Sequence, residues 1–236
     1  MRLQKYLANQ GLCSRSQGEA LINQGRISVN GKVAVIGDRV TGEEEVTFDG
    51  RIVEQKGSAE KKVLLFHKPM GVESSLNKIV GGVTLADYDF GTERVFPIGH
   101  LDANAHGILL LTNDGELANK LSGRKKGLVQ EYTLTFEATV PEEISEKLLN
   151  ELQKHGDDNI LAVSHKEDNE KALIVKTRSL RSKDIRRVAE SYHVALIDIC
   201  RHSIGPICLA ELVEGKNITL SQKDYEHLVM LASIAP

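Results

Sequence analysis

The stretch PIGHLDANAHGILLLTNDG, residues 97–115, decides the fold of the region around it. Two apolar runs, Arg94–Ile98 and Ile108–Thr112, flank a polar loop that contains Asp102. Short apolar runs bounded by turn-forming residues predict strands. Asn113-Asp114-Gly115 then turns the chain into GELANKL, which has the composition of a helix. We therefore expect a strand, a turn that carries one aspartate, and a buried strand.

The sequence on either side of this stretch mixes further strands and helices. Strands are expected at VLLFHKP from Val63, at EYTLTFEATV, near Ala172–Arg178, at VALIDIC and around Ile207–Leu212, and helices over Glu142–Gln153 and Asp184–Tyr192. Strict β-α alternation is missing, which favours an α+β fold with a mixed, largely antiparallel sheet flanked by helices.

The N-terminal part has a different pattern, that of a small separate module. Leu3, Tyr6 and Leu7 recur at helical spacing, and Ser14 followed by Gln17 has the form of a capping box that opens a second helix. Asn30-Gly31 lies between two alternating runs, the strongest short-range hairpin signal. We expect two helices followed by a small β-sheet.

A polar segment separates the two patterns. Gln55–Lys62 has no apolar anchor and the composition of a linker. A chain of 236 residues is long enough for a small module and a medium-sized domain. We place the domains at 1–58 and 63–236.

Charge and cysteine content limit the class of protein. The net charge is −3, yet residues 1–40 hold six Lys/Arg against two acidic residues. This local excess fits either a phosphate-binding surface or a solvated helix face. Three cysteines without a C-x-x-C spacing argue against disulfides or structural zinc. The N-terminus does not resemble a secretory signal and no apolar stretch is long enough to span a bilayer, so we expect a soluble cytoplasmic protein.

The first 40 residues resemble an S4 RNA-binding domain along nearly their whole length, from RLQKYLANQGLCSRSQGEALINQG to RISVNGKVAVIGDRV. Such domains bind structured RNA through the two helices and the adjoining hairpin. The resemblance implies RNA contacts by Arg2, Lys5, Ser14, Arg15, Gln24, Arg26, Asn30 and Lys32. It favours the phosphate-binding interpretation of the basic excess.

The remainder resembles the ribosomal RNA pseudouridine synthases of the small-subunit-enzyme type, which join an S4 domain to a catalytic domain. The family motifs are matched in order by HKPMGV (67–72), IGHLDANAHGILLLTNDG (98–115), QEY (130–132), SKDIRRV (182–188) and RHSIGPICLAELVEG (201–215). The stretches RVFPIG…LD and AVIGDRV are most similar to those of the family branch that acts on 23S ribosomal RNA.

The resemblance implies an isomerase that converts uridine to pseudouridine. Asp102 would be the catalytic carboxylate, Arg186 would keep it ionised, and Tyr132 would stack on the target base. The reaction is redox-neutral, so we expect neither cofactor nor metal. The implied partner is ribosomal RNA or a ribosomal subunit precursor, bound by a monomer without membrane contact. Further RNA contacts would come from Lys68, His100, Gln130, Lys183 and Arg187.

Three positions depart from the family pattern and leave alternatives open. His100 stands where the family has Arg, Gln130 where it has Lys, and Asp184 where it has Gln. A mostly neutral imidazole cannot make the forked phosphate contact of a guanidinium. A catalytically impaired RNA-binding or ribosome-assembly module of the same fold is therefore the main alternative. A hydrolase that uses His100, Asp102 and His106 has no nucleophile or metal set to support it.

Overall fold

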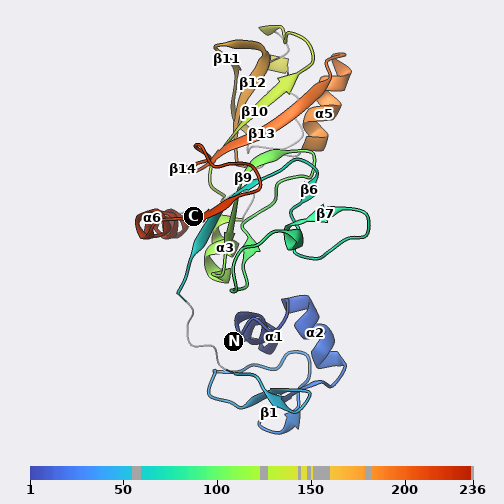
Figure 1. The fold of residues 1–236 in the computed structure, drawn as a ribbon, viewed down its shortest axis with the longest axis vertical. Helices are drawn as coiled ribbons and strands as arrows, with labels where there is room; N and C mark the ends of the chain where they lie inside the picture. Colours follow the sequence, from blue (N-terminus) through green and yellow to red (C-terminus); the bar gives the residue numbers. More distant parts are fainter. Residues whose placement is uncertain are drawn as a thin grey trace. The chain divides into compact units, whose positions relative to one another are not determined.

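A computed structural model describes residues 1–54, 60–122, 127–142, 145–147, 150, 160–178 and 182–234, and the structural statements that follow concern these residues. The chain divides into two compact units, Met1–Glu60 and Lys61–Pro236 (Figure 1). The linker expected at Gln55–Lys62 falls largely outside the described residues. Lys62 already belongs to the second unit, where its amide donates to Asn113 Oδ1 at 2.9 Å. No helix in the described part of the chain has the length and apolarity to cross a bilayer.

The first unit consists of two helices and a four-stranded antiparallel sheet of order β2-β1-β3-β4. Its elements are α1 (Leu3–Asn9), α2 (Arg15–Asn23), β1 (Ile27–Val29), β2 (Lys32–Val33), β3 (Val46–Phe48) and β4 (Arg51–Ile52). Leu3, Tyr6 and Leu7 pack with Ile22 and Ile27 in one apolar core. The helical spacing of the first three residues therefore marks the buried face of α1, as predicted.

Two local predictions in this unit are confirmed. The Ser14 hydroxyl accepts from the Gln17 amide while the Gln17 side chain accepts from the Ser14 amide, which completes the capping box of α2. Asn30 and Gly31 have φ of 49° and 77° and join β1 to β2 with Val29 opposite Lys32. Both residues of this turn need a positive φ, which Asn and Gly adopt at little cost.

The second unit is built on a nine-stranded mixed sheet. Its main path has the order β11-β12-β10-β13-β9-β5-β15, with β8 paired to β9 and β14 to β13. The strands are β5 (Val63–Lys68), β8 (Phe96–Pro97), β9 (His106–Thr112), β10 (Gln130–Phe136), β11 (Ile160–Lys166), β12 (Asn169–Thr177), β13 (Leu196–Ile204), β14 (Ile207–Cys208) and β15 (Asn217–Thr219). The pairing of β13 with β9 is parallel, whereas β5–β9, β10–β12, β10–β13, β11–β12 and β15–β5 pair antiparallel. The α+β prediction is confirmed.

Helices cover both faces of this sheet. One core joins α5 (Ser182–Ser191) to the sheet together with the segment that contains β6 (Val72–Glu73), β7 (Val83–Thr84) and the 3₁₀ turn η1 (Leu85–Asp87). A second core joins α3 (Gly115–Leu121) and α6 (Gln222–Ile234) to the sheet. Figure 1 shows α5 and α6 on opposite sides of the strands. Strand β9 contributes to both cores, Leu109 and Leu111 to the first and Ile108 and Leu110 to the second.

The pairing of β9 with β13 depends on a glycine. Cys200 lies opposite His106 and Arg201 opposite Gly107. Gly107 has a φ of 109°, and a Cβ at this position would lie 2.2 Å from the carbonyl oxygen of Arg201. A side chain here would collide with backbone, so glycine is needed both for the conformation and for the close approach. Gly107 thereby fixes where the strand that follows the Asp102 turn begins.

Some elements differ from the sequence prediction. The strand expected over Arg94–Ile98 is reduced to β8, and β11 and α6 were not predicted. The helix expected over Asp184–Tyr192 begins two residues earlier, at Ser182. The helix expected over Glu142–Gln153 lies mostly outside the described residues.

Candidate active site

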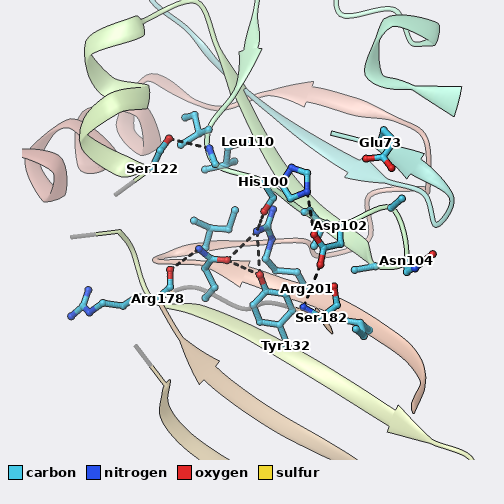
Figure 2. Close-up of a pocket in the computed structure, with 18 of the residues that line it drawn as sticks. Glu73, His100, Asp102, Asn104, Leu110, Ser122, Tyr132, Arg178, Ser182 and Arg201 are labelled. Carbon is cyan, nitrogen blue, oxygen red and sulfur yellow. Dashed lines mark hydrogen bonds and ion pairs between the residues drawn. The ribbon is translucent and has the colours of Figure 1, made fainter. Parts of the chain in front are cut away.

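The turn before β9 opens onto a cavity of about 690 Å³. This volume lies within the range typical of small-ligand sites. Its walls come from the turn itself, from β10, from the start of α5 and from β13 (Figure 2). The polar side chains that line it include those of Glu73, His100, Asp102, Gln130, Tyr132, Arg178, Lys183, Arg186 and Arg201. The second unit therefore brings together all three residues to which the sequence assigned catalysis, Asp102, Tyr132 and Arg186.

Both carboxylate oxygens of Asp102 have a partner. His100 Nε2 lies 3.1 Å from Oδ1, and the backbone amide of Ser182 donates to Oδ2 at 3.3 Å (Figure 2). Ser182 is the first residue of α5, so the Oδ2 contact comes from the positive end of a helix, which favours a carboxylate. The side chain of Asp102 is 39% exposed. It is held in place and still reaches the cavity.

The pKa of Asp102 lies below its usual range. The hydrogen bond from His100 is the largest cause, and burial works against it. The Ser182 amide and the charge of Lys68 lower the pKa further. Asp102 is consequently ionised at neutral pH, as a nucleophile or base must be.

Arg201 is the buried centre of the cavity wall, with 1% of its surface exposed. Its Nε donates to the carbonyl of Ile108 at 2.7 Å, and its Nη1 donates to the carbonyl of His100 at 3.1 Å. Nη1 also lies 3.0 Å from Gln130 Oε1 and 3.3 Å from Tyr132 Oη. One guanidinium thus connects β9, the turn that carries Asp102, and β10. Nη2 is buried with no partner among the described residues.

Tyr132 and Gln130 form a pair on β10. The Tyr132 hydroxyl donates to Gln130 Oε1 at 2.7 Å, and Gln130 Nε2 donates to the carbonyl of Arg178 at 3.2 Å. Tyr132 lines the cavity but is 2% exposed, packed in the sheet core. The amide of Gln130 is engaged within the protein, which differs from the RNA contact expected for it. A neutral acceptor suits a position beside the buried Arg201, where a second cation would be repelled.

Arg186 does not lie as the resemblance implied. It lines the cavity, but its Nη1 donates to the carbonyl of Leu196 at 3.0 Å. Among the described residues no ion pair joins Arg186 to Asp102. The physical reason is the placement of α5. The amide of its first residue, Ser182, donates to Asp102 Oδ2, and Arg186, one turn later, lies beside Leu196 at the start of β13. His100 supplies the side-chain contact instead.

The expected RNA contact by Lys68 does not fit the structure. Lys68 is fully buried, and its Nζ donates to the carbonyls of Pro69 and Val72 at 2.8 and 2.9 Å. Burial and the charge of Arg201 lower the pKa of Lys68 to about 8. The ammonium group holds the loop after β5 in place, and a phosphate could reach it only if that loop opened.

Two further cations expected to bind RNA lie on α5. Lys183 is exposed and lines the cavity, and Arg187 is exposed one turn later. The side chain of Asp184 lies outside what the structure describes. Of these two cations, Lys183 is the one that lines the cavity.

The S4-type residues divide into two groups. Arg2, Arg15, Gln24 and Lys32 are exposed and Lys5 is half-buried, as a phosphate-binding surface requires. The others serve the fold of the first unit. Ser14 caps α2, Asn30 Oδ1 accepts from the Glu45 amide, and Arg26 forms a two-point ion pair with Asp49 and lies 4.7 Å from the centre of the Phe48 ring.

Sequence reasoning missed three residues of the site. Arg201 organises the cavity wall, Ser182 binds Asp102 through its amide, and the Ser74 hydroxyl bridges the amide and carbonyl of Leu101 at 3.2 and 2.6 Å. The family-like tail that begins RHSIG contained a signal for Arg201. Backbone contacts such as that of Ser182 leave no signature in side-chain identity.

Comparison with known proteins identifies the family of the chain. Residues 1–46 match the S4 domain, and residues 62–219 match the family described as RNA pseudouridylate synthase. The chain belongs to the RNA pseudouridine synthase family. The chain is 32% identical over 238 residues to a protein of Bacillus subtilis named ribosomal large subunit pseudouridine synthase B, covering 98% of the chain and 96% of the relative. The resemblance stated from sequence is confirmed.

Other relatives and a solved structure extend the comparison. A Pseudomonas aeruginosa protein with the same name is 31% identical over the whole chain, which spans 63% of that protein's length. The dual-specificity RNA pseudouridine synthase RluF of Escherichia coli is 34% identical over 61% of the chain and 49% of its own length. A crystal structure described as a pseudouridylate synthase matches with a TM-score of 0.64 at 24% identity, covering 97% of this chain and 99% of that one. The last match shows a shared fold.

Proposed function

We propose that this synthase isomerises a uridine of 23S ribosomal RNA to pseudouridine, with Asp102 as the catalytic carboxylate. The observation that carries the proposal is the ionised, half-exposed carboxylate of Asp102, held at both oxygens in a cavity that Tyr132 also lines. Relatives named for the large ribosomal subunit support the choice of RNA. We also propose that it acts in the cytoplasm, where ribosomal RNA is found, and as a monomer.

The reaction is balanced without an external donor. The bond between uracil N1 and ribose C1′ breaks, the base turns, and C5 bonds to C1′. C5 loses its proton and N1 gains one, so no electrons are exchanged with a partner. Asp102 either attacks C1′ or removes the proton at C2′, and both roles require the ionised form.

The other cavity groups bind and orient the nucleotide. A planar ring at Tyr132 in the cavity wall suits a base that has left the RNA helix and must rotate. Stacking on an open ring contributes on the order of 1–3 kcal/mol per base, which is an upper limit for a ring that is 2% exposed. Arg186 and Lys183 supply positive charge at the cavity for the RNA backbone. In the first unit, positive charge for binding RNA comes from Arg2, Lys5, Arg15 and Lys32.

The test is tritium release from ribosomal RNA labelled at uracil C5, because the reaction expels the C5 hydrogen. The full chain should release tritium from 23S but not from 16S transcripts, and Asp102→Asn should release none while binding RNA with unchanged affinity. Pseudouridine mapping in a strain that lacks the gene should then show one missing site in 23S RNA.

The same assay decides on the alternative function. A chain that binds ribosomal RNA tightly, releases no tritium from either RNA, and leaves the modification map unchanged when deleted would be an RNA-binding or assembly module. The engagement of Gln130 inside the protein is the observation that favours this outcome. An active Asp102→Asn variant would refute the assigned carboxylate.

A further inference from the structure

The two partners of Asp102 differ in how firmly they are fixed. The Ser182 amide belongs to the backbone at the start of α5 and cannot turn away while the helix is intact. The His100 imidazole is a side chain that is 60% exposed at the mouth of the cavity. The two contacts fix the plane of the carboxylate, but only the one from His100 can be removed by changing a side chain.

The backbone that carries His100 is anchored at several points. Arg201 Nη1 donates to the His100 carbonyl, and the Ser74 hydroxyl bridges the amide and carbonyl of Leu101. The Ala105 amide closes the turn on the carbonyl of Asp102 at 3.0 Å. A turn held in this way places the imidazole beside the carboxylate without further ordering, so the entropy cost of the contact is small.

The guanidinium that the family resemblance assigns to this role is engaged elsewhere. Arg186 donates to the Leu196 carbonyl at 3.0 Å, whereas His100 Nε2 lies 3.1 Å from Asp102 Oδ1. The same turn that lacks the family's arginine at position 100 therefore provides a different donor at that position. The replacement changes the chemistry of the partner rather than leaving the carboxylate without one.

We propose that His100 is the positioning residue of Asp102: its imidazole holds Oδ1 while the Ser182 amide holds Oδ2, and together they keep the carboxylate ionised and aimed into the cavity. This inference rests on the proposed function, because it concerns how the catalytic carboxylate is prepared. It assigns to His100 the task that the resemblance assigns to Arg186.

The surrounding charges define how the pair responds to pH. The titratable and charged groups around it are Lys68 at the end of β5, Glu73 on β6, Tyr132 on β10, Arg178 directly after β12, Lys183 and Arg186 on α5, and Arg201 on β13. The His100 hydrogen bond is the largest influence that lowers the pKa of Asp102, and burial opposes it. Removal of the imidazole leaves burial less opposed, so the pKa of Asp102 rises.

The rate of isomerisation should depend on pH through the ionisation of Asp102. The reaction needs ionised Asp102, so the rate falls as the pH drops through the pKa of this group. A higher pKa moves that fall to higher pH. His100→Ala should therefore lose activity at a less acidic pH than the wild type. His100→Gln keeps a hydrogen-bond donor of similar reach, and should shift the acid limb less than His100→Ala does.

The experiment is a single-turnover tritium-release profile from about pH 3 to 8.5 with labelled 23S transcript and the full chain, so that the range includes the acid limb expected for a carboxyl whose pKa lies below its usual range. The variants are His100→Ala, His100→Gln and Arg186→Gln. His106→Gln is the matched control, because His106 Nε2 makes the same kind of contact at 3.1 Å, with Asp198. This control should leave the acid limb where it is in the wild type. The expected result is an ordered shift, largest in His100→Ala and absent in the control.

Several outcomes would overturn the inference. An unchanged acid limb in His100→Ala would do so, as would a shift in Arg186→Gln without one in His100→Ala. Carbon-13 NMR of the Asp102 carboxyl in the RNA-free protein gives the same comparison without activity, with Asp102→Asn identifying the signal. A variant Asp102→Asn as active as the wild type would instead remove the proposed function itself, so the two failures are distinguishable.

Discussion

Strand β9 has an aspartate near each end, and the two have different tasks. Asp114, after the strand, caps α3: its Oδ1 accepts from the amides of Glu116 and Leu117, and its Oδ2 accepts from Tyr225 and pairs with Lys61 at 3.0 Å. Its side chain is 8% exposed. Asp102, before the strand, has one partner per oxygen and faces a cavity. A carboxylate saturated with donors stabilises a fold, while one held but accessible can react.

The largest difference between the two aspartates should appear in catalysis. We expect Asp102→Asn to reduce tritium release by at least about 10³-fold, because it removes the reacting group. Asp114→Asn should keep the rate within about threefold of the wild type at a temperature where it is folded. Single-turnover assays of both variants under identical conditions test the contrast. Equal losses of tritium release in the two variants would mean that catalysis and helix capping are not divided between Asp102 and Asp114.

The start of β9 should tolerate change poorly. Gly107→Ala places a Cβ against the Arg201 carbonyl, and we expect a loss of more than about 3 kcal/mol in the free energy of unfolding. Gly91→Ala is the matched control, because Gly91 also has a positive φ, of 85°, but a Cβ there would have no atom within 4 Å. It should cost about 1 kcal/mol. Urea unfolding of both variants makes the comparison, and equal costs would show that conformation rather than close approach requires Gly107.

Stability should show the reverse order of the two aspartates. Asp114→Ala removes the cap of α3 and leaves Lys61 and Tyr225 without their acceptor, so we expect a loss of about 1–2 kcal/mol. Asp102→Ala should cost less than about 1 kcal/mol, since its partners are half-exposed or weakly bound. Chemical denaturation monitored by circular dichroism gives both values. An Asp102→Ala variant less stable than Asp114→Ala would contradict the structural role assigned to Asp114.

The smallest expected effect is the acid dependence of stability. Burial, the largest single influence, raises the pKa of Asp114, but the hydrogen bonds from Lys61 and from the Glu116 and Leu117 amides outweigh it and the pKa is lowered. A lowered pKa adds stability that is fully present above the unfolded value and is lost as the pH falls through the folded one. The stability gap between wild type and Asp114→Asn should therefore be constant near neutrality and narrow below about pH 4. Thermal melts from pH 3 to 7 measure it, and a gap that widens in acid would reverse the sign.

How much the sequence predicted depends on the range of the interaction. The Ser14–Gln17 cap and the Asn30-Gly31 turn involve neighbours three residues apart or fewer, and both were predicted correctly. The network of Arg201 reaches partners 69 to 101 positions away and was missed. The local sequence also could not separate the tasks of Asp102 and Asp114, because both lie in turns beside β9. Lys61, Tyr225 and Ser182, which distinguish them, are brought close by the fold.

The parallel pairing of β9 with β13 also has a consequence for protein synthesis. A growing chain that has emerged as far as residue 178 contains Asp102, His100 and Tyr132 but lacks α5 and β13, and with them Ser182, Gly107's partner strand and Arg201. The turn that carries Asp102 then has His100 and Ser74 but still lacks the Ser182 amide and the Arg201 guanidinium. The complete set of contacts around Asp102 can thus form only in the last quarter of translation, well after the basic N-terminal unit has emerged from the ribosome.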